Sequence, residues 1–143
     1  MRSILVLNSK GGSGKTTIAT NLASFFASIG KSVALVDLDA QQSSISWLKA
    51  RSSAKPPIIG IKGYGEKVKR GVDFKIIDAP AGLQGAALTK VLNMAESVII
   101  PVLPSPIDMR AAEDFIKNIK KHSRVVKKKS KIALVANRGR DYT

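Results

Sequence analysis

The sequence predicts an α/β fold in which a doubly wound, mainly parallel sheet carries helices on both faces. Short apolar runs alternate with segments of helical periodicity along the chain. Most of these runs are unbroken by polar residues, as is typical of strands buried on both faces. Polar or turn-forming residues follow five of the runs, at the position where an open parallel sheet binds its ligands.

Six apolar runs of strand length define the predicted sheet, and several are rich in β-branched residues. They are Ile4–Leu7, Val33–Val36, Ile58–Ile61, Phe74–Ile77, Val98–Val102 and Ile132–Ala136. Glycines at 60, 63 and 65 and the Pro56-Pro57 pair indicate loops between the second and fourth runs.

Helical periodicity fills the gaps between most of these runs, at residues 16–29, around 43–50, and at 83–95 and 108–121. A strand followed by a helix, repeated, predicts parallel pairing with right-handed crossovers. No internal repeat or linker is visible, so residues 1–143 are predicted to form one domain, large enough to bury its own core.

Composition excludes several classes of protein. The chain has no cysteine, which rules out disulfides, thiolate zinc sites and cysteine-ligated iron–sulfur clusters. It contains neither a secretory leader pattern nor an apolar run of membrane-spanning length. We expect a soluble, cytoplasmic protein with no segment inside a membrane.

The net charge predicts a polyanionic partner. Lysine and arginine number 24 against 10 acidic residues, a balance of 24 − 10 = +14. Nucleic acid is the first candidate and an anionic membrane surface the second. The basic residues are concentrated in one cluster, which comprises Lys117, Lys120, Lys121, Arg124, Lys127, Lys128, Lys129 and Lys131. Because no aromatic residue is interleaved with them, this cluster would contact nucleic acid through phosphate only, although it could also be a solvated helix end.

Residues 8–17, NSKGGSGKTT, join the first strand to the first helix and predict a phosphate-binding P-loop. Lys15 would reach the terminal phosphates, and the Thr16 hydroxyl would bind Mg²⁺. The segment departs from the usual pattern because Ser9 stands where the first glycine is expected. It also contains a second lysine, Lys10, which this chemistry leaves unexplained.

Three aspartates follow strands. Asp37 and Asp39 would point to the same side if their strand continued, and could act on the Mg²⁺ water shell or on an attacking water. The alternative is helix capping and turn formation. Asp78 ends an apolar run, as a Walker B acid does, although a turn formed with Pro80 and Gly82 is also possible.

Taken together, the motifs resemble the ParA/MinD family of deviant Walker A ATPases. KGGSGKTT, VDLDAQQ, IIDAPAG, PVLPSPID and the late Asn137 occur in the family's order, and the resemblance covers residues 1 to about 138. The PSPID segment is most similar to the small plasmid partition ParA proteins that lack an N-terminal DNA-binding domain. Ala40 departs from the family's usual proline, which would loosen the turn.

The resemblance implies an ATP site. Lys15 would bind the β- and γ-phosphates, Thr17 would contact the α-phosphate, and Asn137 would contact adenine. The loop residues Gly11, Gly12, Ser13 and Gly14 would complete the phosphate cradle together with Lys10.

It also implies a metal site and a catalytic role for Lys10. Thr16, Asp39 and Asp78 would hold Mg²⁺, the aspartates through water, and Asp39 would orient the hydrolytic water. Lys10 would reach across a nucleotide sandwich dimer to the phosphates of the other subunit, joining Lys15 and Asp39 as a catalytic residue. A lysine supplied in trans would tie hydrolysis to assembly, as an arginine finger does.

The implied function is slow ATP hydrolysis by a homodimer that binds DNA nonspecifically at the nucleoid and drives plasmid or chromosome partition. A ParB-like or cargo adaptor protein would stimulate hydrolysis. One alternative is a positioning ATPase for a protein cargo, such as a chemoreceptor cluster or a carboxysome. Another is a non-hydrolysing DNA scaffold or regulator.

Members of the family usually continue for several elements past the residue that corresponds to Asn137. We therefore expect a fold that is shortened at its C-terminus, either as a fragment or as a short protein.

Overall fold

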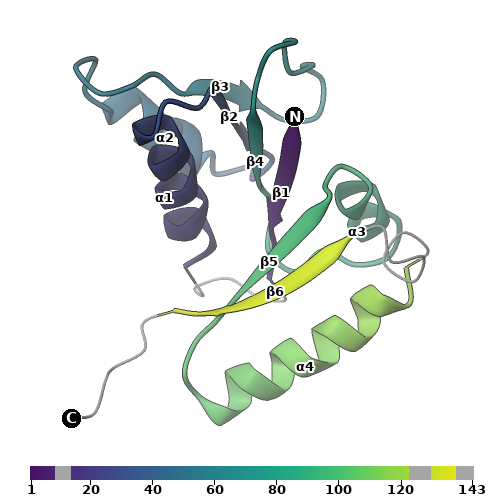
Figure 1. Cartoon of the computed structure of the whole chain (residues 1–143). Helices are drawn as coiled ribbons and strands as arrows, with labels where there is room; N and C mark the ends of the chain where they lie inside the picture. The colour runs from purple at the N-terminus through teal and green to yellow at the C-terminus, as the bar shows by residue number, and fades with distance from the viewer. Residues whose placement is uncertain (9–13, 123–129, 138–143) are drawn as a thin grey trace, which may run out of the picture.

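The structure, a computed structural model, describes residues 1–8, 14–122 and 130–137. These residues form a parallel sheet with helices on both faces (Figure 1). The strands are β1 (Arg2–Val6), β2 (Val33–Asp37), β3 (Ile59–Lys62), β4 (Phe74–Asp78), β5 (Ser97–Val102) and β6 (Lys131–Ala136). The helices are α1 (Lys15–Ser28), α2 (Ser43–Ala50), α3 (Gly85–Leu92) and α4 (Pro106–Lys120).

The strand order in this six-stranded sheet is β3-β2-β4-β1-β5-β6, and every neighbouring pair is parallel. From β1 the chain first builds one side of the sheet and then, from β5 onward, the other. The predicted doubly wound α/β fold is therefore confirmed. Because β1 lies where the order reverses, its carboxyl end is the place where such sheets bind ligands.

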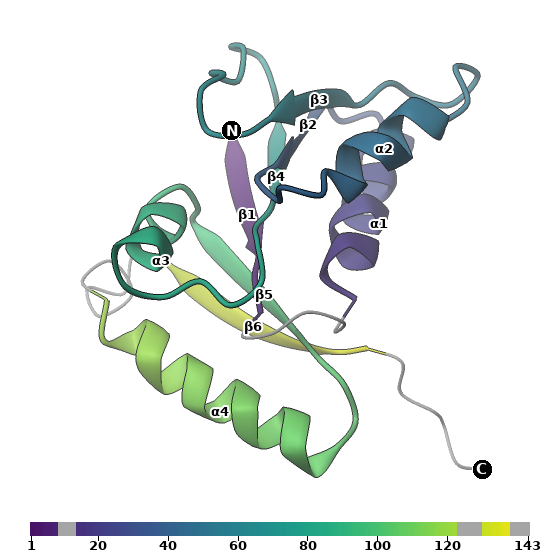
Figure 2. The same cartoon turned by 180° about the vertical axis from the view of Figure 1, so that it is seen from behind.

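The helices lie in two layers. Figures 1 and 2 show α1 and α2 on one face of the sheet and α3 and α4 on the other. One core cluster joins α1 to β1, β2 and β4 through residues such as Ala19, Ala23 and Leu35. The other packs α3 and α4 on the opposite face through residues such as Leu88 and Phe115.

Burial of the strands depends on their place in the sheet. All five residues of the interior strand β2 are buried, as its unbroken apolar run predicts. The edge strands β3 and β6 are not, since Ile59 is 41% and Leu134 is 54% exposed. Gly60, predicted to mark a loop, lies inside β3. The expectation of burial on both faces is thus wrong for the edges, where the sheet has a neighbouring strand on one side alone among the described residues.

Connections between the elements are closed by local hydrogen bonds. Ser105 caps α4 by accepting a hydrogen bond from Asp108 N at 3.1 Å, and Pro106 begins the helix two residues before the predicted start. Thr89 on α3 bonds to Nδ1 of His122 after α4, at 2.7 Å.

None of the helices in the described ranges is long and apolar enough to cross a membrane.

Candidate nucleotide-binding site

Three strand ends converge beside the first turn of α1. The register pairs Asp78, the last residue of β4, with Val6 of β1 and Asp37 of β2, so the carboxyl ends of all three strands lie at one level. Lys15 begins α1 directly after the left-handed Gly14. The sheet and the helix therefore bring polar residues from distant parts of the sequence to one place.

Asp78 is the centre of this cluster. Its side chain is fully buried and one carboxylate oxygen contacts the ammonium group of Lys15. The other oxygen accepts hydrogen bonds from Thr16 Oγ1 at 2.9 Å and from Ser44 Oγ at 2.5 Å. A buried carboxylate needs such partners, since leaving it unpaired would cost several kcal/mol, roughly 3–5 by analogy with other broken buried pairs.

Lys15 lies between two acids. Its Nζ is 3.9 Å from Asp39 Oδ2, and the Asp39 side chain is 29% exposed, so it faces both the lysine and the solvent. The other Asp39 oxygen accepts a hydrogen bond from Gln41 N at 3.0 Å, and Gln42 N bonds to the Asp39 carbonyl at 3.1 Å. The turn is closed by these bonds although Ala40 replaces the family's proline.

Asp37 does not join Asp39 as the period-two spacing predicted. The strand ends at Asp37, and its carboxylate turns back to accept hydrogen bonds from Asp39 N and Ile45 N, both at 3.0 Å. Ile45 is in the first turn of α2, so Asp37 caps that helix from a neighbouring strand. The capping alternative is the one observed. Burial raises the pKa of Asp37, the two backbone N–H groups lower it, and the carboxylates of Asp78 and Asp39 raise it further.

Asn137 lies directly against the start of α1. A Cβ atom placed on Gly14 would come within 1.8 Å of Asn137 Nδ2, and Gly14 has a φ of +86°. Asn137 is held after β6 by a hydrogen bond from its backbone N to Val102 O, at 2.9 Å. The residue predicted to contact adenine is therefore beside the phosphate-binding loop, 137 − 14 = 123 positions later in the sequence.

The structure brings together only part of the predicted site. Lys15, Thr16, Asp39, Asp78 and Asn137 meet there, whereas Thr17 is exposed on the first turn of α1. Lys10, Gly11, Gly12 and Ser13 lie outside the described residues. Of the predicted DNA-contacting cluster, Lys117, Lys120 and Lys121 are exposed at the end of α4, and Arg124, Lys127, Lys128 and Lys129 lie outside the described residues.

Two features of the site had no signal in the sequence. Ser44 looks like an ordinary residue of a helix start, yet its hydroxyl donates to Asp78. The contact between Gly14 and Asn137 joins opposite ends of the chain. Both depend on how α2 and β6 pack, and no local spacing encodes that packing.

The donor set fits a nucleotide with a divalent cation. A helix N-terminus with a lysine suits phosphate, and a threonine hydroxyl beside a carboxylate suits Mg²⁺. Within the part of the chain that the structure describes, no group of three or more His, Cys, Asp or Glu side chains could hold a metal ion. A Mg²⁺ ion here would therefore need oxygen atoms from phosphate or water, as is usual for this ion.

Comparison with known proteins identifies the family. Residues 4–142 match the family described as the CobQ/CobB/MinD/ParA nucleotide binding domain. The chain belongs to this family. The ParA/MinD resemblance predicted from the motifs is thereby confirmed.

Relatives of this CobQ/CobB/MinD/ParA domain include two curated proteins named maintenance of carboxysome distribution protein A. The one from Halothiobacillus neapolitanus is 33% identical over 144 residues, covering 94% of this chain and 65% of the relative. The one from Gloeobacter kilaueensis is 37% identical over 117 residues, covering 76% of this chain and 52% of the relative. The domain thus spans between half and two thirds of their length.

Solved structures share the fold of this ParA/MinD-type domain. A putative plasmid partition protein from Borrelia burgdorferi bound to AMPPNP has a TM-score of 0.76 at 18% identity, covering 99% of this chain and 78% of that one. The pNOB8 ParA protein bound to nonspecific DNA has a TM-score of 0.70 at 18% identity, covering 98% of this chain and 69% of that one. At such identities the similarity shows the fold alone.

Proposed function

We propose that this chain is the nucleotide switch of a ParA/MinD-type ATPase, which binds ATP with Mg²⁺, closes into a homodimer and hydrolyses ATP slowly. One observation carries the proposal. The lysine that begins α1 shares a buried carboxylate with the threonine next to it, while Asp39 lies 3.9 Å away at the solvent edge of the same cluster. This arrangement supports binding of phosphate by Lys15 and of a metal ion beside Thr16 and Asp78.

In the structure, Lys15 and Thr16 both bind the carboxylate of Asp78. Lys15 and the backbone N–H groups at the start of α1 would hold the phosphates, and Thr16 and Asp78 would hold Mg²⁺, Asp78 through water. The cation would neutralise phosphate charge when bound. Asp39 has the exposure that a residue orienting a water molecule requires. Asn137, beside Gly14, would then border the nucleoside end of the ligand.

Lys10 would complete the site in trans. Lys15 already lies beside Asp78 and Asp39 in its own subunit, where it would bind the phosphates. Lys10 would instead contact the phosphates bound by a second subunit, which is a role that Lys15 does not fill. Hydrolysis would then depend on dimer formation.

We propose that the whole protein positions a cargo over DNA that it binds nonspecifically in the cytoplasm. The +14 charge and the exposed lysines at the end of α4 support contact with phosphate. The names of the curated relatives favour a protein assembly as the cargo, the first of the two alternatives to partition given above. Plasmid or chromosome partition is the other candidate, favoured by the PSPID segment.

The proposal is tested by the mass of the purified chain in solution. Light scattering with Mg²⁺ and ATP should give twice the mass seen with ADP, and Lys10→Ala should stay monomeric with both nucleotides. A folded chain that binds ATP and remains monomeric would contradict the dimer. A dimer that hydrolyses no ATP would instead support the scaffold alternative.

The cargo is tested in cells. Deletion of the gene, followed by imaging of intracellular protein assemblies and by a count of plasmid loss, separates the two candidates. Clustered assemblies with stable plasmids would support a protein cargo. Plasmid loss with normally spaced assemblies would support partition.

A further inference from the structure

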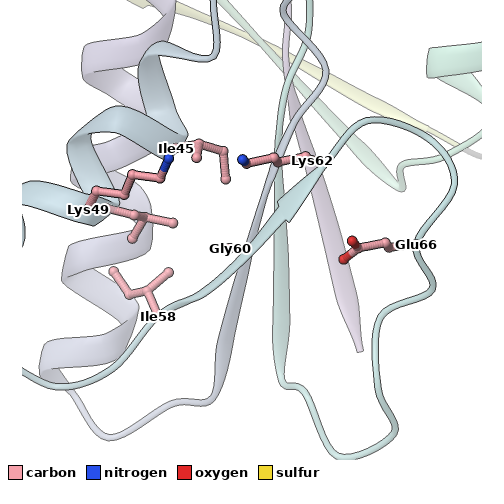
Figure 3. Close-up of a pocket in the computed structure, with 7 residues that line it drawn as sticks. Ile45, Lys49, Ile58, Gly60, Lys62 and Glu66 are labelled. Carbon is pink, nitrogen blue, oxygen red and sulfur yellow. The ribbon is translucent and has the colours of Figure 1, made fainter.

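Away from the nucleotide-binding site, a hollow lies between α2 and the edge strand β3 (Figure 3). Its volume is about 440 Å³. Ile45 and Leu48 of α2 and Ile58 before β3 give it an apolar wall, and Gly60 lies on the β3 side. The hollow is large enough for one or two aliphatic side chains.

Gly60 explains why α2 lies so near the strand. A Cβ atom at this position would come within 2.9 Å of Leu48 Cδ1 and 3.2 Å of Ile45 Cδ1. Without a side chain there, β3 presents bare backbone beside the apolar wall. A ligand in the hollow would therefore meet main-chain groups as well as aliphatic carbon.

The strand beside this hollow has an open edge. β3 is the outermost strand, and within the described residues the sheet pairs it with β2 alone. Ile59 on this strand is 41% exposed. An edge strand offers N–H and C=O groups to any extended chain that lies alongside it.

The charge around the hollow is positive. Lys49 and Lys62 line it, both are exposed, and neither makes an ion pair with another described residue. In Figure 3 the Lys62 side chain reaches from β3 toward α2. Glu66 is the one acidic residue of the lining. Exposed basic residues at 67, 69 and 70 follow it.

We propose that this surface binds an extended acidic segment of a partner protein, which adds a strand to β3. An aliphatic side chain of the segment would enter the hollow, and its carboxylates would face Lys49 and Lys62. Strand addition gives affinity through main-chain hydrogen bonds, and pockets for alternate side chains give specificity. The binding needs no nucleotide, so the test is independent of the proposed ATP switch.

Two other occupants fit the surface less well. Nucleic acid would match the charge, but phosphate contacts would use neither the apolar wall nor the open backbone edge of β3. A second copy of the chain paired edge to edge would bring like charges together at Lys62, an arrangement that disfavours pairing. An acidic peptide satisfies the charge, the edge and the apolar wall together.

The test uses a fluorescein-labelled octapeptide in which valine and glutamate alternate, with binding to the full chain followed by fluorescence anisotropy. A peptide of the same sequence with alternate amides N-methylated keeps the charges and loses strand pairing. A valine–lysine peptide reverses the charge. We expect binding of the first peptide alone, together with slower hydrogen exchange at Ile59–Lys62.

The variant Lys49→Glu/Lys62→Glu should weaken binding roughly tenfold or more, the effect expected when two exposed opposite-charge contacts become repulsive. Lys31→Glu, exposed and outside the lining, is the control for a charge reversal elsewhere on the surface and should bind normally. Circular dichroism of all variants checks the fold.

Three results would overturn the proposal. Equal binding of the N-methylated peptide, or equal weakening by Lys31→Glu, would show attraction by charge alone. Displacement of the peptide by a short DNA duplex, with loss of duplex binding in the double variant, would assign the surface to nucleic acid. No peptide binding, with self-association of Lys62→Ala, would mean that Lys62 serves only to protect the edge.

Discussion

At the scale of single residues, the structure shows how one carboxylate organises the site. The Asp78 carboxylate contacts a lysine of α1 and accepts hydrogen bonds from two hydroxyl groups, one on α1 and one on α2. The roles of Lys15, Thr16 and Asp78 could be predicted because the spacing that defines them is local: a glycine loop before a helix and an acid after an apolar run. Ser44 could not, because its contact is made between elements.

The two lysines of the loop should behave differently when each is changed to alanine. Lys15→Ala should abolish ATP binding, since its ammonium group is the one placed at the start of α1. Lys10→Ala should bind ATP with nearly normal affinity and fail to dimerise or hydrolyse it. Isothermal titration with ATP, beside a hydrolysis assay, measures both. Equal loss of ATP binding in the two variants would refute the in-trans role of Lys10.

Gly14 should be intolerant of a side chain for two separable reasons. Its left-handed backbone costs about 1–2 kcal/mol for any residue with a Cβ. The added methyl group would also collide with Asn137. Gly14→Ala should therefore lose more stability in urea than the backbone cost alone, because the Asn137 side chain must also shift.

The double variant Gly14→Ala/Asn137→Ala serves as the control for this collision. It removes the clash and keeps the backbone strain, so part of the stability should return. If the loss of unfolding free energy in the double variant equals the sum of the losses in the two single variants, Gly14 and Asn137 are not energetically coupled.

At the scale of secondary-structure elements, the apolar runs predict where the strands are but not how deeply each is buried. Every predicted strand is present, and no observed bound differs from the predicted one by more than two residues. The exposure of β3 and β6 could not be predicted, because an apolar run does not say whether its strand lies at the centre or the edge. Helix α3 ends at Leu92, where the chain turns after Asn93, so it is shorter than the predicted 83–95.

Asp37 fastens α2 to β2, and its titration should be visible in the stability of the fold. Burial holds the pKa of Asp37 above its ordinary value of 3.8. The folded state then binds the proton at a higher pH than the unfolded chain does. Stability from this group should grow as pH falls through the folded-state pKa toward 3.8, and should be lost as pH rises.

Urea unfolding of the wild type and of Asp37→Asn, in Mg²⁺-free buffer between neutral pH and pH 4, isolates this effect. The free energy of unfolding of the wild type minus that of the variant should increase as pH falls. A difference that stays constant, or decreases, would mean that the pKa of Asp37 is not raised in the folded protein.

At the scale of the whole molecule, the excess of positive charge should make DNA affinity depend on salt. Each phosphate contact lowers the slope of log affinity against log salt by about 0.9. The triple change of Lys117, Lys120 and Lys121 to glutamate should weaken binding to a duplex of random sequence and make the slope shallower. A matched triple change of Lys67, Lys69 and Arg70 should have a smaller effect.

Fluorescence anisotropy over a range of salt concentrations, with ATP and with ADP, measures both triple variants. A DNA affinity that depends neither on the salt concentration nor on the nucleotide would remove DNA from the proposed function. If the control variant loses more affinity than the α4 variant, the DNA surface lies near β3 and not at α4.

The placement of Asn137 against Gly14 also bears on how the protein is made. Translation adds about 5–20 residues per second, so on the order of ten seconds separates the emergence of the two residues from a ribosome. During that interval the growing chain has its glycine loop, but the side chain that adjoins it has not been synthesised. Completion of the site therefore waits until the residue after β6 has been synthesised. A ribosome stalled before β6 should hold a chain with most of its core and an incomplete pocket, so capture of nucleotide would report that synthesis has passed this point.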